Sequence, residues 1–176
     1  MKSNYIPSRF KIYEIGFTLV ELLVVMAILG VLVTIALVSF RNSQARGRDA
    51  QRKSDLKQIS SALELFYSDY GKYPDDSGGA ILACPYNTST TCAWGTGEFG
   101  DGKTIYFKVM PKDPVSGQNY YYRIADAPNG QKFQLFAYLE NTQDPDLIIP
   151  PTGYLCGGGT KYCNFAITSS NTKPSE

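Results

Sequence analysis

The sequence predicts an α+β fold, in which one long N-terminal helix packs on a small antiparallel β-sheet. An uncharged apolar run from Leu22 to Phe40, followed by an amphipathic stretch that ends near Tyr70, predicts the helix. Two runs rich in aromatic residues, separated by Asn-Gly, predict the sheet. We therefore expect residues 17–40 and 41–70 to form the two halves of one helix, and residues 71–176 to form a globular region of loops and strands.

The apolar half of the predicted helix is long enough to cross a membrane. Leu22–Phe40 contains no charged residue, and with residues 17–21 it gives a helix of roughly 36 Å, compared with about 30 Å for the hydrocarbon core of a bilayer. The run also exceeds the apolar core of about 7–15 residues found in ordinary secretory signals. The simplest interpretation is a single-pass N-terminal anchor.

The second half of the predicted helix changes to an amphipathic pattern without a turn signal. Five apolar residues recur at steps of three and four, as expected for one face of a helix: Leu56, Ile59, Leu63, Phe66 and Tyr70. Gly71, followed by Pro74, predicts that the helix ends near Tyr70. This face should form half of the core of the globular region.

Residues 41–57 contain six basic and two acidic residues. One interpretation is a surface that binds lipid or nucleic-acid phosphates. The other is a solvated helix face whose charges pair with Asp49, Asp55 and neighbouring chains. We favour the second because no aromatic residues lie between the charges to stack on bases, and we expect no nucleic-acid partner.

The globular region contains three candidate strands, at residues 120–125, 132–140 and 164–169. The first two are separated by residues 126–130, where Asn-Gly predicts a hairpin turn. Residues 95–100 match the spacing G-x-G-x-x-G, but no apolar strand precedes them, and Asp-Gly follows where a helix should begin. We therefore assign residues 95–100 to a loop rather than to a nucleotide site.

The composition argues against an enzyme. The chain has 176 residues, a net charge of +1 and no histidine. The lack of histidine removes the most common general base and most metal sites. No spacing of serine, lysine or acidic residues identifies a nucleophile with its base. We expect no catalytic residues and no required cofactor.

The four cysteines fall in two close pairs, Cys84 with Cys92 and Cys156 with Cys163. Neither pair has the C-x-x-C spacing of zinc or thioredoxin-type sites. Short spacing within loops rich in glycine and small polar residues favours two local disulfides, which form outside the cytosol. Four cysteines allow three pairings, and four free thiols remain the alternative.

Glu21 is unusual because it places a carboxylate at the start of a membrane-length apolar run. The stretch Gly16-Phe17-Thr18-Leu19-Val20-Glu21 resembles the class III signal of type IV prepilins and type II secretion pseudopilins. The resemblance implies a pilin fold and a leader at residues 1–16. It also implies cleavage between Gly16 and Phe17, N-methylation of Phe17, and a role for Phe17 and Glu21 in fitting one subunit against the next.

A second resemblance runs through the helix and the first strand. Asp55-Leu56, Tyr73-Pro74 and Pro111-Lys112-Asp113-Pro114 resemble the major pseudopilin of type II secretion, whereas the C-terminal part matches less well. Members of that family bind calcium in a late loop, and the resemblance makes Asn141, Asp144 and Asp146, with Gln143 nearby, candidate calcium ligands. The alternative for these residues is ordinary turn formation.

These resemblances imply a structural subunit of a type IV pilus or of a type II secretion pseudopilus. The implied partners are copies of the chain itself, a prepilin peptidase, an assembly ATPase with its inner-membrane platform protein, and minor pilins. The subunit would lie in the inner (cytoplasmic) membrane before assembly and then in an extracytoplasmic or cell-surface filament. The alternative is a single-pass membrane-anchored extracytoplasmic binding domain that does not polymerise.

The charges that flank the apolar run conflict with this topology. The segment before the run carries a net charge of +2, and residues 41–57 carry +4. The positive-inside rule would therefore place the globular region in the cytoplasm. The cysteine pairs and the resemblance to an exported family predict the opposite side, and we give these more weight.

Overall fold

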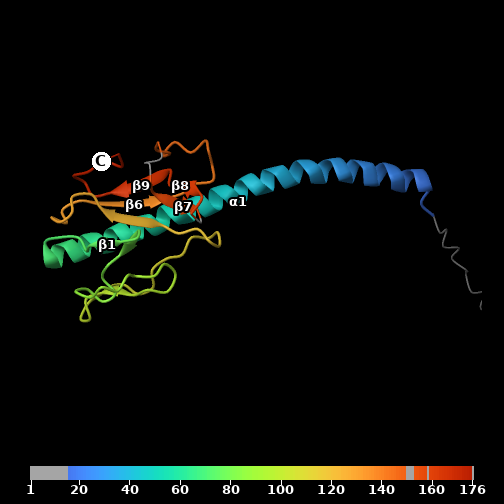
Figure 1. Ribbon diagram of the computed structural model, residues 1–176. Coiled ribbons are helices and arrows are strands. Elements are labelled where there is room, and N and C mark those ends of the chain that lie inside the picture. The colour runs from blue at the N-terminus through green and yellow to red at the C-terminus, as the bar shows by residue number, and fades with distance from the viewer. Residues whose placement is uncertain (1–15, 150–152, 158, 176) are drawn as a thin grey trace, which may run out of the picture. The chain divides into compact units, whose positions relative to one another are not determined.

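The computed structural model describes residues 16–149, 153–157 and 159–175 (Figure 1). The expected leader therefore lies outside the described residues, except for Gly16. The chain divides between Arg41 and Asn42 into two units. The first unit consists of the N-terminal part of a helix, and the second is the globular unit.

The helix, α1, runs from Leu19 to Tyr70, 52 residues. This confirms the expected helix, which begins two residues later than predicted. At its C-terminal end Gly71 adopts a positive φ of 68°, and its N–H donates to the carbonyl oxygen of Tyr67 at 2.8 Å. This is the αL type of helix end, which explains why glycine follows Tyr70.

The main sheet contains three antiparallel strands in the order β5-β6-β9 (Figure 1). They are β5 (Tyr121–Ile124), β6 (Phe133–Ala137) and β9 (Phe165–Thr168). All three expected strands are confirmed, and each is shorter than predicted. The central strand β6 pairs Leu135 with Tyr122 on one side and with Ile167 on the other.

Three small hairpins complete the globular unit. They are β1 (Asp76–Ser77) with β2 (Ala80–Ile81), β3 (Phe99–Gly100) with β4 (Ile105–Phe107), and β7 (Leu155–Gly157) with β8 (Lys161–Tyr162). The segment with G-x-G-x-x-G spacing ends in β3, and no helix occurs in residues 101–110, all of which are described. The assignment of that segment to a loop therefore holds.

The core lies between α1 and one face of β6. The buried helix residues Leu56, Ile59, Leu63 and Phe66 pack in one cluster with the buried strand residues Phe133, Leu135 and Ala137. The predicted helical face is therefore confirmed as far as Phe66. Tyr70 differs from the prediction, because it is exposed and stacks on Phe66 with a ring-centroid distance of 4.6 Å.

The opposite face of β6 is buried as well. Phe136 lies in a second cluster with Cys156 and Cys163 of the β7–β8 segment, and its ring stacks on Tyr154 at 5.1 Å. Every residue of β6 is consequently buried. The small disulfide-closed hairpin thus covers the sheet face that α1 does not reach.

The connection between β5 and β6 is longer than the two-residue turn that Asn-Gly suggests. The N–H of Ala125 donates to the carbonyl oxygen of Lys132 at 2.9 Å, which closes a six-residue loop. The carboxylate of Asp126 accepts the N–H groups of Gln131 and Lys132. Gly130 supplies a positive φ of 67° within this loop. Asp126 therefore organises the turn along with the glycine.

Both local cysteine pairs are bonded in the structure. Cys84 is joined to Cys92, and Cys156 to Cys163, each with a Cα–Cα distance of 5.1 Å. The pairing is therefore the one that the short spacing suggested. Each bond closes a short loop next to a buried cluster.

Replacing Leu63 with alanine should destabilise the globular unit by about 2–5 kcal/mol, because truncating a fully buried leucine leaves a cavity. Leu65→Ala is the matched control, since Leu65 lies on the same helix and is 60% exposed. Its effect should stay within about 0.5 kcal/mol. Denaturant unfolding of the full chain in detergent measures both. Equal losses in the two variants would contradict the assigned core face.

Candidate functional site

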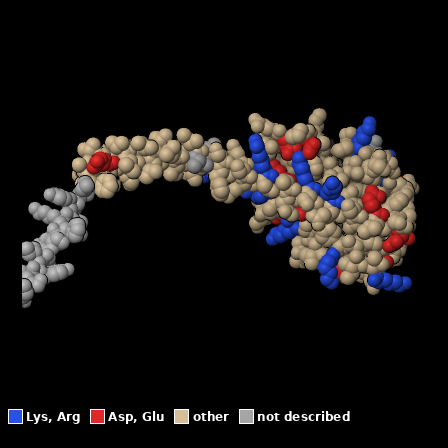
Figure 2. Space-filling model, turned by 180° about the vertical axis from the view of Figure 1, so that it is seen from behind, with Lys and Arg blue, Asp and Glu red and all other residues tan. Residues whose placement is uncertain are grey.

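The N-terminal half of α1 presents an apolar surface that nothing in the described structure covers. Phe17 is 90% exposed, and the helix passes through a window of mean hydropathy 2.9 with none of it buried. Among the described residues α1 is the one helix long and apolar enough to cross a membrane. Figure 2 shows that Lys, Arg, Asp and Glu side chains gather on the globular unit, whereas the helical unit consists almost wholly of other residue types.

Glu21 closes the N-terminus of α1. The Thr18 hydroxyl oxygen accepts the Glu21 N–H at 3.2 Å, and the Glu21 carboxylate accepts the Thr18 N–H at 2.8 Å. The Thr18 hydroxyl also donates to this carboxylate at 2.9 Å. These reciprocal bonds form a capping box, in which Thr18 is the N-cap and Glu21 the third helical residue. The carboxylate therefore has a partner within its own chain.

The sequence analysis missed this cap, although T-x-x-E before an apolar run is its known signal. A carboxylate in the first turn also interacts favourably with the positive end of the helix dipole. The cap therefore explains part of why a glutamate is tolerated at this position.

Three of the basic residues in 41–57 are held by acidic residues of the globular unit. Arg48 binds Glu140, Arg52 binds Asp113, and Lys53 binds Asp144 and Asp146. All four of these acidic partners lie more than 60 positions away in the sequence. We expected a helix face whose charges form ion pairs, and these three residues do form them. Their acidic partners lie in the same chain.

Arg52 is completely buried and uses all five of its N–H donors. Its Nε and Nη2 donate to the two oxygens of Asp113 at 2.8 and 2.9 Å. Its Nη1 donates to Asp49 and Glu140, both at 2.8 Å, and Nη2 donates also to Gln118 at 3.2 Å. A buried cation needs such partners, because its desolvation is otherwise unfavourable.

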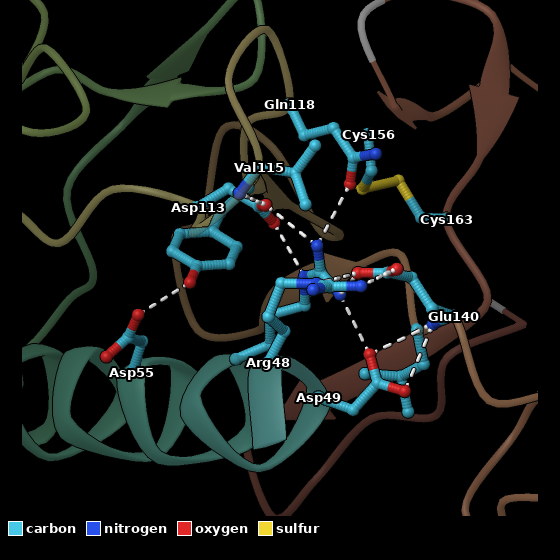
Figure 3. Close-up of polar contacts among 12 residues, drawn as sticks. Arg48, Asp49, Asp55, Asp113, Val115, Gln118, Glu140, Cys156 and Cys163 are labelled. Atoms are coloured by element: carbon cyan, nitrogen blue, oxygen red, sulfur yellow. Dashed lines mark hydrogen bonds and ion pairs between the residues drawn. A yellow bond between two sulfur atoms is a disulfide. The ribbon is translucent and has the colours of Figure 1, made fainter. Parts of the chain in front are cut away.

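Arg48 and Asp49 extend this cluster along the helix. Arg48 binds both oxygens of Glu140 at 2.7 and 2.6 Å, and the Asp49 carboxylate accepts the N–H groups of Glu140 and Asn141. In Figure 3 Arg48 and Asp49 rise from α1 toward Glu140, and Asp113 points to the same place from another segment. We call Arg48, Asp49, Arg52, Asp113, Gln118 and Glu140 the arginine clamp.

The charges in the clamp shift one another's ionisation. The hydrogen bond from Arg48, with further contributions from Arg52, lowers the pKa of Glu140 from 4.5 to about 2, although burial opposes the shift. Burial alone would lower the pKa of Arg52, but its bonds to Asp113, Glu140 and Asp49 raise it above the ordinary value. Arg48, Arg52 and Glu140 are therefore held in their charged forms at neutral pH.

The sequence analysis recognised Lys112-Asp113-Pro114 as a motif but assigned no role to Asp113. The structure shows that Asp113 binds Arg52 and also accepts the N–H of Val115 at 2.8 Å. The spacing of Asp49 and Arg52, three residues apart on a helix, was a local signal of an ion pair, although Arg46 lies at the same distance in sequence from Asp49. Neither Glu140 nor Gln118 gave a signal in the local sequence that it would contact Arg52.

The three calcium candidates lie near one another on a loop after β6, and each already uses one side-chain oxygen in a contact within the chain. The side-chain oxygen of Asn141 accepts the N–H of Gln143 at 3.2 Å. Asp144 and Asp146 each bind the ammonium group of Lys53, at 2.6 and 2.7 Å. In the described part of the chain no three acidic or cysteine side chains come together in a way that could hold a metal ion. In the described structure these candidates therefore contact a lysine and a backbone N–H of the same chain.

A long helix whose first half is exposed and apolar, and whose second half packs on a small antiparallel sheet, is a pilin-like arrangement. The chain matches the family described as "Prokaryotic N-terminal methylation motif" over residues 13–37, and "Type II secretion system (T2SS), protein G" over residues 39–145. The chain belongs to the type II secretion system protein G family. Its N-terminal segment carries the prepilin methylation motif.

Curated relatives include both pilins and pseudopilins. Type IV major pilin protein PilA of Myxococcus xanthus is 41% identical over 68 residues, which cover 39% of this chain and 31% of that protein. Type II secretion system core protein G of Pseudomonas aeruginosa is 31% identical over 109 residues, 61% of this chain and 71% of that protein. Fimbrial protein EcpC of Eikenella corrodens is 36% identical over 116 residues, which cover 56% of this chain and 76% of that protein.

The chain thus spans about a third of PilA and roughly three quarters of the other two relatives. No solved structure gives a significant match.

Replacing Arg52 with methionine should destabilise the globular unit by about 3–5 kcal/mol, because it leaves buried carboxylates without their cation. Arg46→Met is the matched control, since Arg46 is exposed on the same helix. Its change should stay within about 0.5 kcal/mol. Thermal and denaturant unfolding in detergent measure the difference. A loss for Arg52→Met no larger than that for Arg46→Met would show that the clamp contributes little.

Proposed function

We propose that this chain is a structural subunit of a filament. It is made as a prepilin, cut after Gly16, held in the membrane by residues 17–40 and then assembled through the same residues. The observation that carries the proposal is the exposed apolar surface of the first half of α1. Such a surface is far larger than the isolated apolar patches of ordinary soluble proteins, so it marks a membrane or protein contact.

The apolar character of this surface suits both the membrane-bound subunit and the assembled filament that we propose. The hydrophobic effect is non-directional, so the same side chains are covered equally well by lipid or by helices of other subunits. In lipid, the backbone polar groups beyond the first turn of α1 are satisfied by hydrogen bonds within the helix itself. In a filament, the segment packs against identical segments of neighbouring copies. Assembly therefore exchanges one apolar environment for another.

Glu21 provides what the apolar surface lacks, a specific polar contact. In the single chain its charge is turned toward the N-terminus of its own helix by the Thr18 cap. After cleavage, Phe17 would carry a free α-amine four residues before Glu21. We propose that a carboxylate of one subunit pairs with the N-terminal amine of its neighbour, which fixes the register that apolar contacts alone leave undefined.

The proposal names further partners from the family resemblance. These are a prepilin peptidase, an assembly ATPase with its inner-membrane platform protein, and minor pilins. The proposed location is the inner membrane before assembly and an extracytoplasmic filament afterwards. The match to protein G supports a secretion pseudopilus, and the match to PilA supports a pilus. Cell fractionation separates the two.

Filament protein should begin at Phe17 with one added methyl group, because the proposed peptidase cuts after Gly16. Intact-mass and N-terminal analysis of sheared filaments and of membranes measure this. Recovery in the sheared fraction supports a pilus, and recovery in the envelope alone supports a short pseudopilus. A mature chain that starts at Met1 and is found only in membranes would reject assembly and favour a single-pass anchored binding domain.

Glu21→Gln should be processed and inserted normally but should fail to enter filaments. Glutamine at this position preserves the capping box, whereas the substitution removes the charge. Thr18→Ala is the complementary control, because it removes the cap at a cost of about 0.5–2 kcal/mol and keeps the carboxylate. Filament yield per cell measures both. Normal assembly of Glu21→Gln together with failed assembly of Thr18→Ala would show that Glu21 serves only as a cap.

A further inference from the structure

The loop that follows β6, residues 140–147, is attached to α1 by two side chains one helical turn apart. The carboxylate of Asp49 accepts the N–H groups of Glu140 and Asn141 at distances between 2.8 and 3.1 Å. The ammonium group of Lys53 binds the carboxylates of Asp144 and Asp146. Asp49 thus holds the first part of the loop, and Lys53 holds the second.

Lys53 occupies the centre of this second attachment. Its Nζ lies 2.6 Å from Asp144 Oδ1 and 2.7 Å from Asp146 Oδ2, and 5.4 Å from the ring centroid of Phe165. Asp144 Oδ1 also accepts the N–H of Asp146 at 3.0 Å. The side chain of Asp144 is 13% exposed and that of Lys53 is 28% exposed, so the contact is partly shielded from water.

A calcium ion at the same place would need the same oxygens. Calcium binds six to eight oxygen ligands, with carboxylates as its main partners. Here the two carboxylates are bound to an ammonium group, and the side-chain oxygen of Asn141 accepts a backbone N–H. A divalent ion between Asp144 and Asp146 would also meet the positive charge of Lys53 at close range. The two cations therefore exclude each other.

We propose that Lys53 is a built-in substitute for a metal ion: its ammonium group orders the loop 140–147, and the loop is therefore stable without calcium. Residues 141–147 consequently form an internal ion-pair site instead of a metal site. This inference does not rest on filament assembly, because it concerns contacts within a single globular unit.

The electrostatics of the group support this assignment. Burial tends to lower the pKa of Lys53, but the hydrogen bonds that its ammonium group donates to Asp144 and Asp146 outweigh this effect, and the net shift is upward. The hydrogen bond from Lys53 lowers the pKa of Asp144. Lys53 and Asp144 thus stay charged at neutral pH. Because the cation is part of the chain, its local concentration does not depend on the medium outside the cell.

Lys53→Met tests the proposal, because methionine keeps an unbranched apolar stem and removes the charge. Lys57→Met is the matched control, since Lys57 is exposed one turn further along α1. Melting temperatures of the full chain in detergent should be compared in EDTA and in calcium chloride at equal ionic strength. We expect Lys53→Met to melt about 2–4 °C below Lys57→Met in EDTA, and to regain most of this difference when calcium is added.

The wild-type chain and Lys57→Met should melt at the same temperature with and without calcium. A wild-type melting temperature that rises with calcium would overturn the proposal, as would a Lys53→Met variant that melts like Lys57→Met in EDTA. A calcium titration of the wild-type chain by calorimetry provides a test that does not depend on how the variant folds. No binding heat is the expected result, and saturable binding at one site per chain would contradict it.

Discussion

The arrangement of the globular unit depends on Arg52, because a buried guanidinium group must be neutralised and fully hydrogen-bonded. Arg52 has no exposed surface, and its five donors reach Asp49 on the helix, Asp113 and Gln118 on a long loop, and Glu140 after the central strand. A buried ion pair of this kind gives little net stability compared with an apolar replacement, but breaking it is costly. Its main effect is therefore to fix which segments meet.

The two halves of α1 use opposite kinds of interaction. The first half offers non-directional apolar contact, which suits a segment proposed to leave lipid and enter a helical bundle. The second half combines an apolar face, centred on Leu63, with directional bonds from Arg48, Arg52 and Lys53. Directional bonds tolerate little displacement, so the helix stays in one register on the sheet. A subunit needs both properties: an exchangeable assembly surface and a fixed globular shape.

The loops of the globular unit are stabilised by groups within the chain. The disulfide between Cys84 and Cys92 closes one loop, and that between Cys156 and Cys163 closes the hairpin that covers Phe136. A lysine on the helix secures a third loop through two carboxylates. These devices suit a protein proposed to work outside the cytosol, where disulfides persist and ion concentrations vary.

The sequence by itself determined the features that depend on local pattern. The steps of three and four from Leu56 to Phe66 predicted the buried face of the helix, Gly71 predicted its end, and two aromatic-rich runs separated by Asn-Gly predicted the sheet. The prepilin methylation motif, matched over residues 13–37, and the apolar run within it were also readable, because composition and spacing along the chain encode them.

Only the tertiary structure decided which charges meet. Residues 41–57 looked like a solvated basic stretch, because nothing local distinguishes the buried Arg52 from the exposed Arg46. The partners of Arg52 and Lys53 lie between 61 and 93 positions away, except for Asp49, and packing of the helix on the sheet brings them together. The calcium candidates show the same limit: Asp144 and Asp146 carry side chains of a kind that binds metal ions, and in the folded chain both contact Lys53, which lies more than 90 positions away.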